Sequence, residues 1–263
     1  MNDGVIYVAT GRGYVDLALQ SLVSLRASNP TLAADLFTDD VGASGLEAFD
    51  QVHSVPVRHS RAKLECLPLS RFQRTLFLDC DTLVVGDLGN VWGLLDRFDL
   101  ALAHDVRRAS DLVQEGLEVV TPYAFPQLNS GVVLYRKSDA VDQFFADWAA
   151  RYHTSGVARD QIVLKDMLWE TDLRFYVLPP EFNLRRVTEL DAWEPLDAQI
   201  KIVHSHRLLQ HLRGGAAQVT TLEDLVALER LALAEEWKAA GHADPQLSEK
   251  IMWFLASEGN GRY

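Results

Sequence analysis

The stretch Arg74-Thr-Leu-Phe-Leu-Asp79-Cys80-Asp81-Thr82-Leu-Val-Val-Gly86-Asp87 passes from apolar residues to two carboxylates and back to apolar residues. Its first apolar part is typical of a buried β-strand. In an extended segment the side chains of Asp79 and Asp81 point to the same face, while Cys80 points away. Converging carboxylates repel each other unless a cation lies between them or one is protonated. The stretch therefore predicts a Mg²⁺ or Mn²⁺ site that also holds a diphosphate.

The composition narrows the class of protein. With 263 residues, 48% of them hydrophobic, the chain can form one large domain with an appendage. It has no apolar run of about 18 residues and no basic leader, so we expect neither a membrane span nor a secretory signal. Two cysteines, Cys66 and Cys80, favour a reducing, cytoplasmic setting. The net charge of −12 disfavours binding to nucleic acid or to an anionic membrane.

Short apolar runs alternate with helical patterns along most of the chain. This alternation predicts an α/β fold with a Rossmann-like sheet that is flanked by helices. We expect strands over residues 5–9, 34–38, 51–57, 76–78, 82–85, 99–104, 127–135, 175–178 and 200–207, and helices over 15–28, 42–50, 61–67, 90–97, 139–152 and 159–168. Residues 105–126 are expected to form a loop with a short helix. From about residue 214 the pattern is helical, so we predict a domain over 1–213 and a C-terminal helical extension over 214–263 that packs on it.

Several polar residues near the expected strand ends allow two interpretations. The turn after the first strand, Gly11-x-Gly13, is either a nucleotide contact or only a tight turn. Asp160 is either a site residue or a helix cap. Gly131, at the entry to a strand, is typical of a place where another group approaches the backbone closely. His204 and His206 lie two residues apart in another expected strand and share a face as the two aspartates do, so either could be a third metal ligand.

Six motifs occur in the order found in one known family. They are Val-Ile-Tyr-Val-Ala-Thr-Gly, Arg-Thr-Leu-Phe-Leu-Asp-Cys-Asp-Thr-Leu, Leu-Asn-Ser-Gly-Val-Val-Leu-Tyr, Arg-Asp-Gln-Ile, Leu-Pro-Pro-Glu-Phe-Asn and Ile-Val-His, spread over residues 4–207. In this order the chain resembles GT-A fold glycosyltransferases, most closely glycosyltransferase family 8, the family of glycogenin and lipopolysaccharide galactosyltransferases. The resemblance implies a nucleotide-sugar transferase that uses a UDP-sugar donor, Mn²⁺ (or Mg²⁺) and a carbohydrate or other hydroxyl acceptor.

The resemblance also implies roles for particular residues. The metal ligands are Asp79, Asp81 and His204, and the reacting carbon of the sugar is faced by Asp160 and Gln161. The nucleotide and its sugar contact Ala9, Thr10, Tyr14, Arg61, Lys63, Cys80, Asn129, Ser130 and Asn183. The family's usual Lys-Pro-Trp after the histidine is missing here, and Arg207 or Arg213 would supply the charge that its lysine gives to the diphosphate. Members of this type retain the anomeric configuration; we expect front-face attack by the acceptor, with a covalent intermediate on Asp160 as the less favoured variant.

Two other functions fit parts of the sequence. The Asp79-x-Asp81-x-Thr82 pattern is also that of haloacid-dehalogenase-type phosphatases, in which the first aspartate is the nucleophile, but that fold usually carries it on the first strand. The altered segment after His204 is also compatible with a protein that binds nucleotide sugar without turning it over, that is, a catalytically silent scaffold. The C-terminal helices could pack on the domain, bind an acceptor or form a homodimer.

Overall fold

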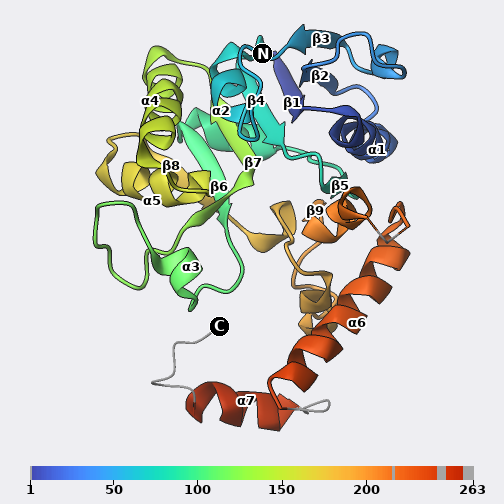
Figure 1. The fold of residues 1–263 in the computed structure, drawn as a ribbon, viewed down its shortest axis with the longest axis vertical. Helices are drawn as coiled ribbons and strands as arrows, with labels where there is room; N and C mark the ends of the chain where they lie inside the picture. Colours follow the sequence, from blue (N-terminus) through green and yellow to red (C-terminus); the bar gives the residue numbers. More distant parts are fainter. Residues whose placement is uncertain (1, 215–216, 242–246, 257–263) are drawn as a thin grey trace.

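The structure is a computed structural model and describes residues 2–214, 217–241 and 247–256. Its centre is a mixed seven-stranded sheet in the order β3-β2-β1-β4-β7-β6-β8 (Figure 1). Strand β7 runs antiparallel to both of its neighbours, whereas the other pairs are parallel. The strands are β1 (Asp3–Ala9), β2 (Ala33–Thr38), β3 (Gln51–Ser54), β4 (Arg74–Leu78), β6 (Leu100–His104), β7 (Leu128–Arg136) and β8 (Phe175–Leu178).

Helices cover both faces of the large sheet. Successive residues of a strand point to opposite faces, and in β1 Val5 and Tyr7 belong to one apolar cluster while Ile6 belongs to the other. The first cluster includes α1 (Arg12–Ser28), and the second includes α2 (Lys63–Cys66), α4 (Asp139–Ser155) and α5 (Asp160–Glu170). The sequence therefore predicted the α/β architecture and its flanking helices correctly.

A second, two-stranded sheet positions part of the candidate site. After Leu78 the chain leaves the large sheet, and β5 (Thr82–Val84) pairs antiparallel with β9 (Ile202–His204). The two runs around the acidic motif therefore belong to different sheets. The two carboxylates lie in the link between these sheets, a place where the backbone must change direction.

Some short elements differ from the expectation. Residues 42–50 and 90–97 were expected to form α-helices, but they contain the 3₁₀ turns η1 (Leu46–Ala48) and η3 (Val91–Asp96). Both segments carry glycine, which lowers the stability of an α-helix interior. The remaining short elements are η2 (Leu67–Leu69), α3 (Asp111–Gln114), η4 (Pro180–Phe182), η5 (Val187–Ala192) and η6 (His206–Arg213).

The C-terminal part contains α6 (Leu222–Ala239) and α7 (Leu247–Ala256). Thr221 is the N-cap residue of α6, and its hydroxyl accepts a hydrogen bond from the Asp224 N–H, as the capping pattern predicts. It lies beside η6 and then extends away from the large sheet (Figure 1). Residues 215–216, 242–246 and 257–263 of the expected extension lie outside the described residues. Across the described ranges, no helix combines the length and the apolar character that crossing a membrane requires.

Candidate active site

Asp79 and Asp81 are fixed by backbone pairing on two sides. The N–H of Asp79 donates to Gly131 O of β7 at 2.7 Å, and the carbonyl of Asp81 accepts from Ser205 N, just after β9, at 3.1 Å. Between them the Cys80 thiol donates to Val8 O of β1 at 3.2 Å. The side chain of Cys80 is therefore directed into the protein, away from the carboxylates. The sequence predicted this from the alternation of an extended segment, but Cys80 and Asp81 lie in a turn between β4 and β5, so the turn produces the arrangement.

His204 joins the two carboxylates because β9 pairs with β5. Thr82 lies opposite His204 in that pairing, which brings the imidazole next to Asp81. His204 Nε2 lies 3.3 Å from Asp81 Oδ1 and 4.0 Å from Asp79 Oδ2. The structure thus brings together, within 4.8 Å of one another, ligand atoms of all three residues that the sequence suggested for the metal.

Gly131 makes room for this group. A Cβ atom at this position would lie 2.0 Å from His204 Cε1 and 2.7 Å from Asp79 Oδ2, distances that side chains do not tolerate. The close approach that the sequence predicted at this glycine is therefore present. It is made by two of the candidate metal ligands themselves.

Two asparagines orient the imidazole. His204 Nδ1 donates to Asn183 Oδ1 at 3.0 Å, and Asn183 Nδ2 donates to Asn129 Oδ1, also at 3.0 Å. Because Nδ1 donates to Asn183, Nε2 is the ring nitrogen that faces the carboxylates and that would bind a metal ion. Asn129 and Asn183 were expected to contact the donor sugar, but in this structure both amides belong to the chain of hydrogen bonds that supports His204.

The chemistry of this donor set fits a divalent cation such as Mn²⁺. It offers carboxylate oxygens and the Nε2 atom of one imidazole. Burial alone would raise the pKa of Asp81, but the neighbouring His204 and Arg185 outweigh it, so that the pKa lies below its usual value and the carboxylate is ionised. Buried charges of this kind are usually paired or bound to metal.

His206 does not lie on the same face of the backbone as His204. Of the two histidines that the sequence offered as a metal ligand, His204 is the one that lies beside the carboxylates. The strand ends at His204, and Ser205 caps η6 by accepting a hydrogen bond from Arg207 N. The i, i+2 rule applies only while the backbone stays extended. Desolvation and the nearby Arg207 and Arg185 lower the pKa of His206 to about 4, so that its ring is neutral at physiological pH.

A cationic group lies beside the acids. Lys63 Nζ is buried and lies 3.4 Å from Asp79 Oδ1 and 3.6 Å from Asp160 Oδ2, and it donates to the carbonyl and the hydroxyl of Ser130 at 2.9 and 3.0 Å. Arg61 Nε lies 3.3 Å from Asp160 Oδ1. Lys63 therefore connects the metal-ligand group with Asp160, which begins α5. This places four predicted residues (Arg61, Lys63, Ser130 and Asp160) in one contiguous network.

Asp160 is held as a carboxylate. Burial alone would raise its pKa, but Lys63, Arg61 and the Ser130 hydroxyl, which donates to Oδ2 at 2.7 Å, lower it below the usual value. Trp148 Nε1 donates to its backbone carbonyl at 3.0 Å and fixes the start of α5. Asp160 is the first residue of α5 and follows the N-cap residue Arg159, so it does not cap the helix, and both of its carboxylate oxygens are directed to cations.

Asp105 is a buried carboxylate that the sequence reasoning missed. Its Oδ2 accepts from Gln161 Nε2 at 2.7 Å and from Asn129 Nδ2 at 3.4 Å, and Arg185 Nε lies 3.8 Å from its Oδ1. Asp105 follows β6 directly, so it occupies the same kind of strand-end position as Asp79. That signal could have identified it, but residues 105–126 were treated as one loop.

The other predicted nucleotide contacts lie around the glycine turn and η6. Ala9 is buried at the end of β1, Thr10 follows in the turn, and Tyr14 is 45% exposed in the first part of α1. The turn itself is held by Asp39, which accepts a hydrogen bond from Gly11 N at 2.7 Å. Arg207, at the start of η6, lies 3.8 Å from Glu236 of α6.

Comparisons with known proteins agree on one type of fold. No protein-family model matches the chain. It is 28% identical over 244 residues to Glycogenin-1 of Caenorhabditis elegans, covering 82% of this chain but only 52% of that protein, so the chain spans about half the length of this curated relative. Among solved structures, GlyE of Streptococcus pneumoniae TIGR4 superposes with a TM-score of 0.57 at 18% identity, covering 93% of this chain and 66% of that one. Galactosyltransferase LgtC, solved with donor and acceptor sugar analogues, gives a TM-score of 0.53 at 17% identity, covering 77% and 86%.

This chain has a GT-A glycosyltransferase fold. The structural likenesses, both below 20% identity, establish the fold alone. The relative and both neighbours are glycosyltransferases. The predicted resemblance to family 8 is confirmed.

One cavity of this GT-A chain adjoins the metal-ligand group. It measures about 170 Å³ and lies between the loop after β6, the segment before η5, η6 and α6. Arg185 connects it to the metal-ligand group, because its guanidinium donates to His204 O at 2.8 Å. Its lining side chains are Val106, Arg107, Arg185, Arg186, Thr188, His206, Arg207, Glu229, Leu233 and Glu236. We call it the arginine-lined cavity.

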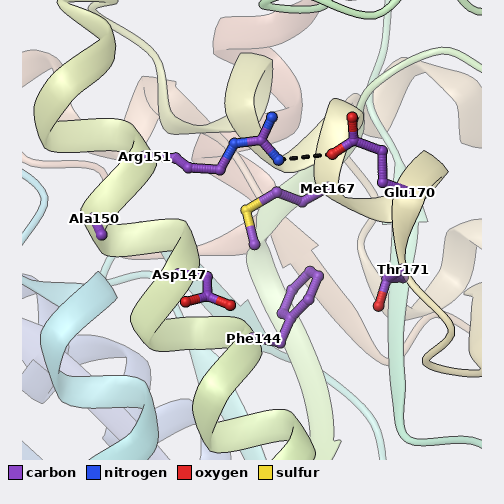
Figure 2. A pocket seen from close by; sticks show the side chains of 7 residues that line it. All are labelled: Phe144, Asp147, Ala150, Arg151, Met167, Glu170 and Thr171. Atoms are coloured by element: carbon purple, nitrogen blue, oxygen red, sulfur yellow. Dashed lines mark hydrogen bonds and ion pairs between the residues drawn. The ribbon is translucent and has the colours of Figure 1, made fainter.

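A second cavity of about 340 Å³ lies between α4 and α5 (Figure 2). Arg151 and Glu170 form an ion pair of 2.8 Å beside it, and Phe144 and Met167 supply its apolar wall. None of the candidate site residues lines this cavity. It therefore lies outside the site described above.

Proposed function

We propose that the protein is a metal-dependent glycosyltransferase that moves a sugar from a nucleotide-diphosphate donor, a UDP-sugar, to an acceptor hydroxyl with retention of configuration. The observation that carries this proposal is the convergence of Asp79, Asp81 and His204 beside the Lys63–Asp160 network. When bound there, Mn²⁺ would act as a Lewis acid on the departing diphosphate. Lys63 would supply further positive charge on the same side of the donor.

Asp160 and Gln161 are proposed to face the reacting carbon of the sugar. Both oxygens of Asp160 are directed to cations or a hydroxyl, which favours a stabilising role over that of a free nucleophile. Gln161 uses its amide N–H groups on Asp105 and Leu128 O, so its carbonyl oxygen is the atom left to face a carbon that develops positive charge. These contacts support front-face attack by the acceptor, with the covalent route through Asp160 as the less favoured variant.

The nucleotide is proposed to lie along the end of β1, near Ala9, Thr10 and Tyr14. Cys80 would contribute through its backbone, because its side chain is bonded to Val8 O. Arg207 or Arg213, in the altered segment after His204, is proposed to supply positive charge to the diphosphate. The cytoplasmic setting and a homodimer through the C-terminal helices remain predictions from the sequence.

The arginine-lined cavity supports a proposal about the acceptor. Its wall carries four arginines and two glutamates in a chain whose net charge is −12. Glu229 is occupied by hydrogen bonds from Val187 N and the Ser205 hydroxyl, and Glu236 is shared by Arg107 and Arg207. The local excess of positive charge favours an acceptor that carries a phosphate or a carboxylate. The contribution of α6 to this cavity agrees with the acceptor-binding role that the sequence left open for the C-terminal helices.

A donor assay tests the proposal. The intact chain is incubated with a panel of nucleotide sugars, with and without Mn²⁺, and donor hydrolysis and thermal stability are measured. We expect slow hydrolysis and an increased melting temperature with a UDP-sugar only when Mn²⁺ is present. Binding without any hydrolysis would favour the silent scaffold, and efficient release of phosphate from phosphate esters with Mg²⁺ would favour the phosphatase.

A further inference from the structure

A second group of histidine and carboxylate side chains lies around α2. His59 is in the loop before this helix, Glu65 is within it, and His153 is in the last turns of α4. The Glu65 carboxylate joins the two imidazoles: its Oε2 lies 2.9 Å from His59 Nε2, and its Oε1 lies 2.5 Å from His153 Nε2. Ligand atoms of the three residues all lie within 4.8 Å of one another. None of them belongs to the group formed by Asp79, Asp81 and His204.

We propose that His59, Glu65 and His153 form a second metal site, which takes Zn²⁺ or a similar transition-metal ion. Two imidazole nitrogens and one carboxylate are a common Zn²⁺ donor set, with water as the fourth ligand. Ligand atoms around a tetrahedral Zn²⁺ are about 3.3 Å apart. The Glu65 carboxylate therefore has to move away from the two imidazoles by less than about 1 Å for the ion to bind. The side chains of His153 and Glu65 are 46% and 17% exposed, so an ion and its water can reach the group from solvent.

The charges around the group permit a cation. Two arginines belong to the same loop as His59 and would repel the ion if their side chains faced it. Arg58 is instead paired with Asp39 at 2.6 Å, and Arg61 is paired with Asp160 at 3.3 Å. Both guanidinium groups are thus directed to other carboxylates, and Glu65 supplies negative charge between the imidazoles.

Metal binding would couple this group to the candidate active site through one hydrogen bond. The N–H of Arg61 donates to His59 Nδ1 at 3.1 Å, so the proton of that imidazole resides on Nε2, where it is shared with Glu65. A neutral imidazole has one N–H, so an ion on Nε2 leaves the proton on Nδ1, which can no longer accept from Arg61 N. Filling the site would therefore move the backbone next to Arg61 while the ion joins this loop to α4.

The direct test is a metal titration of the intact protein. The chain is first saturated with Mn²⁺, and Co²⁺ is then added as a spectroscopic probe, followed by Zn²⁺ in competition. We expect one additional ion per chain with the visible absorption of tetrahedral Co²⁺, displaced by Zn²⁺. His153→Gln and Glu65→Gln should each weaken this binding at least about tenfold, because each removes one of three protein ligands.

His53→Gln is the matched control. His53 lies 3.5 Å from the Asp35 carboxylate but belongs to no group of three ligands within the described residues. Zn²⁺ should increase the melting temperature of the wild type and of this control, but not that of His153→Gln. The proposal is overturned if the wild type binds Co²⁺ no more tightly than about 0.1 mM, or if the binding survives both substitutions. It is also overturned if Asp81→Asn, rather than His153→Gln, removes the Co²⁺ signal. None of these outcomes depends on whether the chain transfers a sugar.

Discussion

The metal-ligand group and the arginine-lined cavity are neighbours that share Arg185, yet they are assembled in different ways. The three ligands sit at strand ends and are held by the β4–β7 and β5–β9 pairings. The cavity is formed by side chains from four separate segments, which meet only through tertiary packing. The first region is acidic, with Asp81 and His204 buried and Asp79 partly exposed, and the second is basic and reaches the surface. We infer that the acidic region holds the donor and that the basic region selects the acceptor.

The largest expected effect tests the acidic region. Asp81→Asn removes a ligand charge while keeping the size of the side chain, so Mn²⁺-dependent donor hydrolysis should fall by at least about 1,000-fold. Mn²⁺ affinity is measured by titration and hydrolysis by release of the nucleotide. Asp87→Asn is the control, since it removes the same charge from an exposed position a few residues further along the chain. Unchanged Mn²⁺ affinity in Asp81→Asn would remove the metal from the proposed mechanism.

An intermediate effect tests whether backbone pairing, rather than flexible side chains, sets the spacing of the ligands. In Gly131→Ala the new methyl group would overlap His204 Cε1 and Asp79 Oδ2, so the two ligands must move apart. We expect Mn²⁺ affinity to fall about 10- to 100-fold, and the free energy of unfolding to fall by about 1–3 kcal/mol. Titration with Mn²⁺ and chemical denaturation measure the two quantities.

Gly93→Ala is the control for this substitution. A Cβ at Gly93 would meet no atom within 4 Å, and its backbone does not adopt a positive φ. If Gly131→Ala bound Mn²⁺ as tightly as Gly93→Ala, the ligands would have enough freedom to adjust. The rigid spacing that we attribute to the β4–β7 pairing would then be wrong.

The two regions also differ in how far the sequence predicts them. Asp79 and His204 could be recognised because each lies at the end of a short apolar run, and Asp81 because it directly precedes another. Side-chain alternation was the reason given for the convergence of the two carboxylates, but in the structure a turn at Cys80 and Asp81 brings them together. Asp105 obeys the same rule at the end of β6 and could have been found. What the sequence could not reveal is that Asn129 and Asn183 support the imidazole, since that depends on the distance between side chains from different elements.

The arginine-lined cavity carries no comparable sequence signal. The cavity's arginines are far apart in the chain, and in the sequence each one is typical of an isolated surface charge. They include Arg107, Arg186 and Arg207. Arg107 also adopts a positive φ of 59°, a conformation that a non-glycine residue does not favour and that no local pattern predicted. Helix α6 was expected to pack on the domain, but its residue pattern does not indicate which charged side chains face a cavity. Strand-end sites can therefore be read from motifs, whereas this cavity depends on the tertiary structure.

The smallest expected effect tests the basic region. Arg186 lines the arginine-lined cavity. Its charge acts on the carboxyl group of Glu189, but among the described residues it forms no ion pair within 4.0 Å, so its guanidinium can bind an anionic acceptor. Arg186→Gln should raise the KM for a sugar phosphate about tenfold, which corresponds to the loss of one charge-assisted hydrogen bond. The KM for the same sugar without its phosphate should change much less. The rate of donor hydrolysis should also change less than the rate of sugar transfer.

Comparison with Arg97→Gln separates this local effect from the loss of one positive charge in the whole protein. Arg97 is exposed beside η3 and does not line the cavity. If Arg186→Gln and Arg97→Gln had the same KM for the sugar phosphate, the cavity would not distinguish acceptors by their charge. If Arg186→Gln instead impaired donor hydrolysis as strongly as transfer, the arginines would act on the diphosphate. The division between an acidic donor region and a basic acceptor region would then have to be abandoned, because both regions would serve the same ligand.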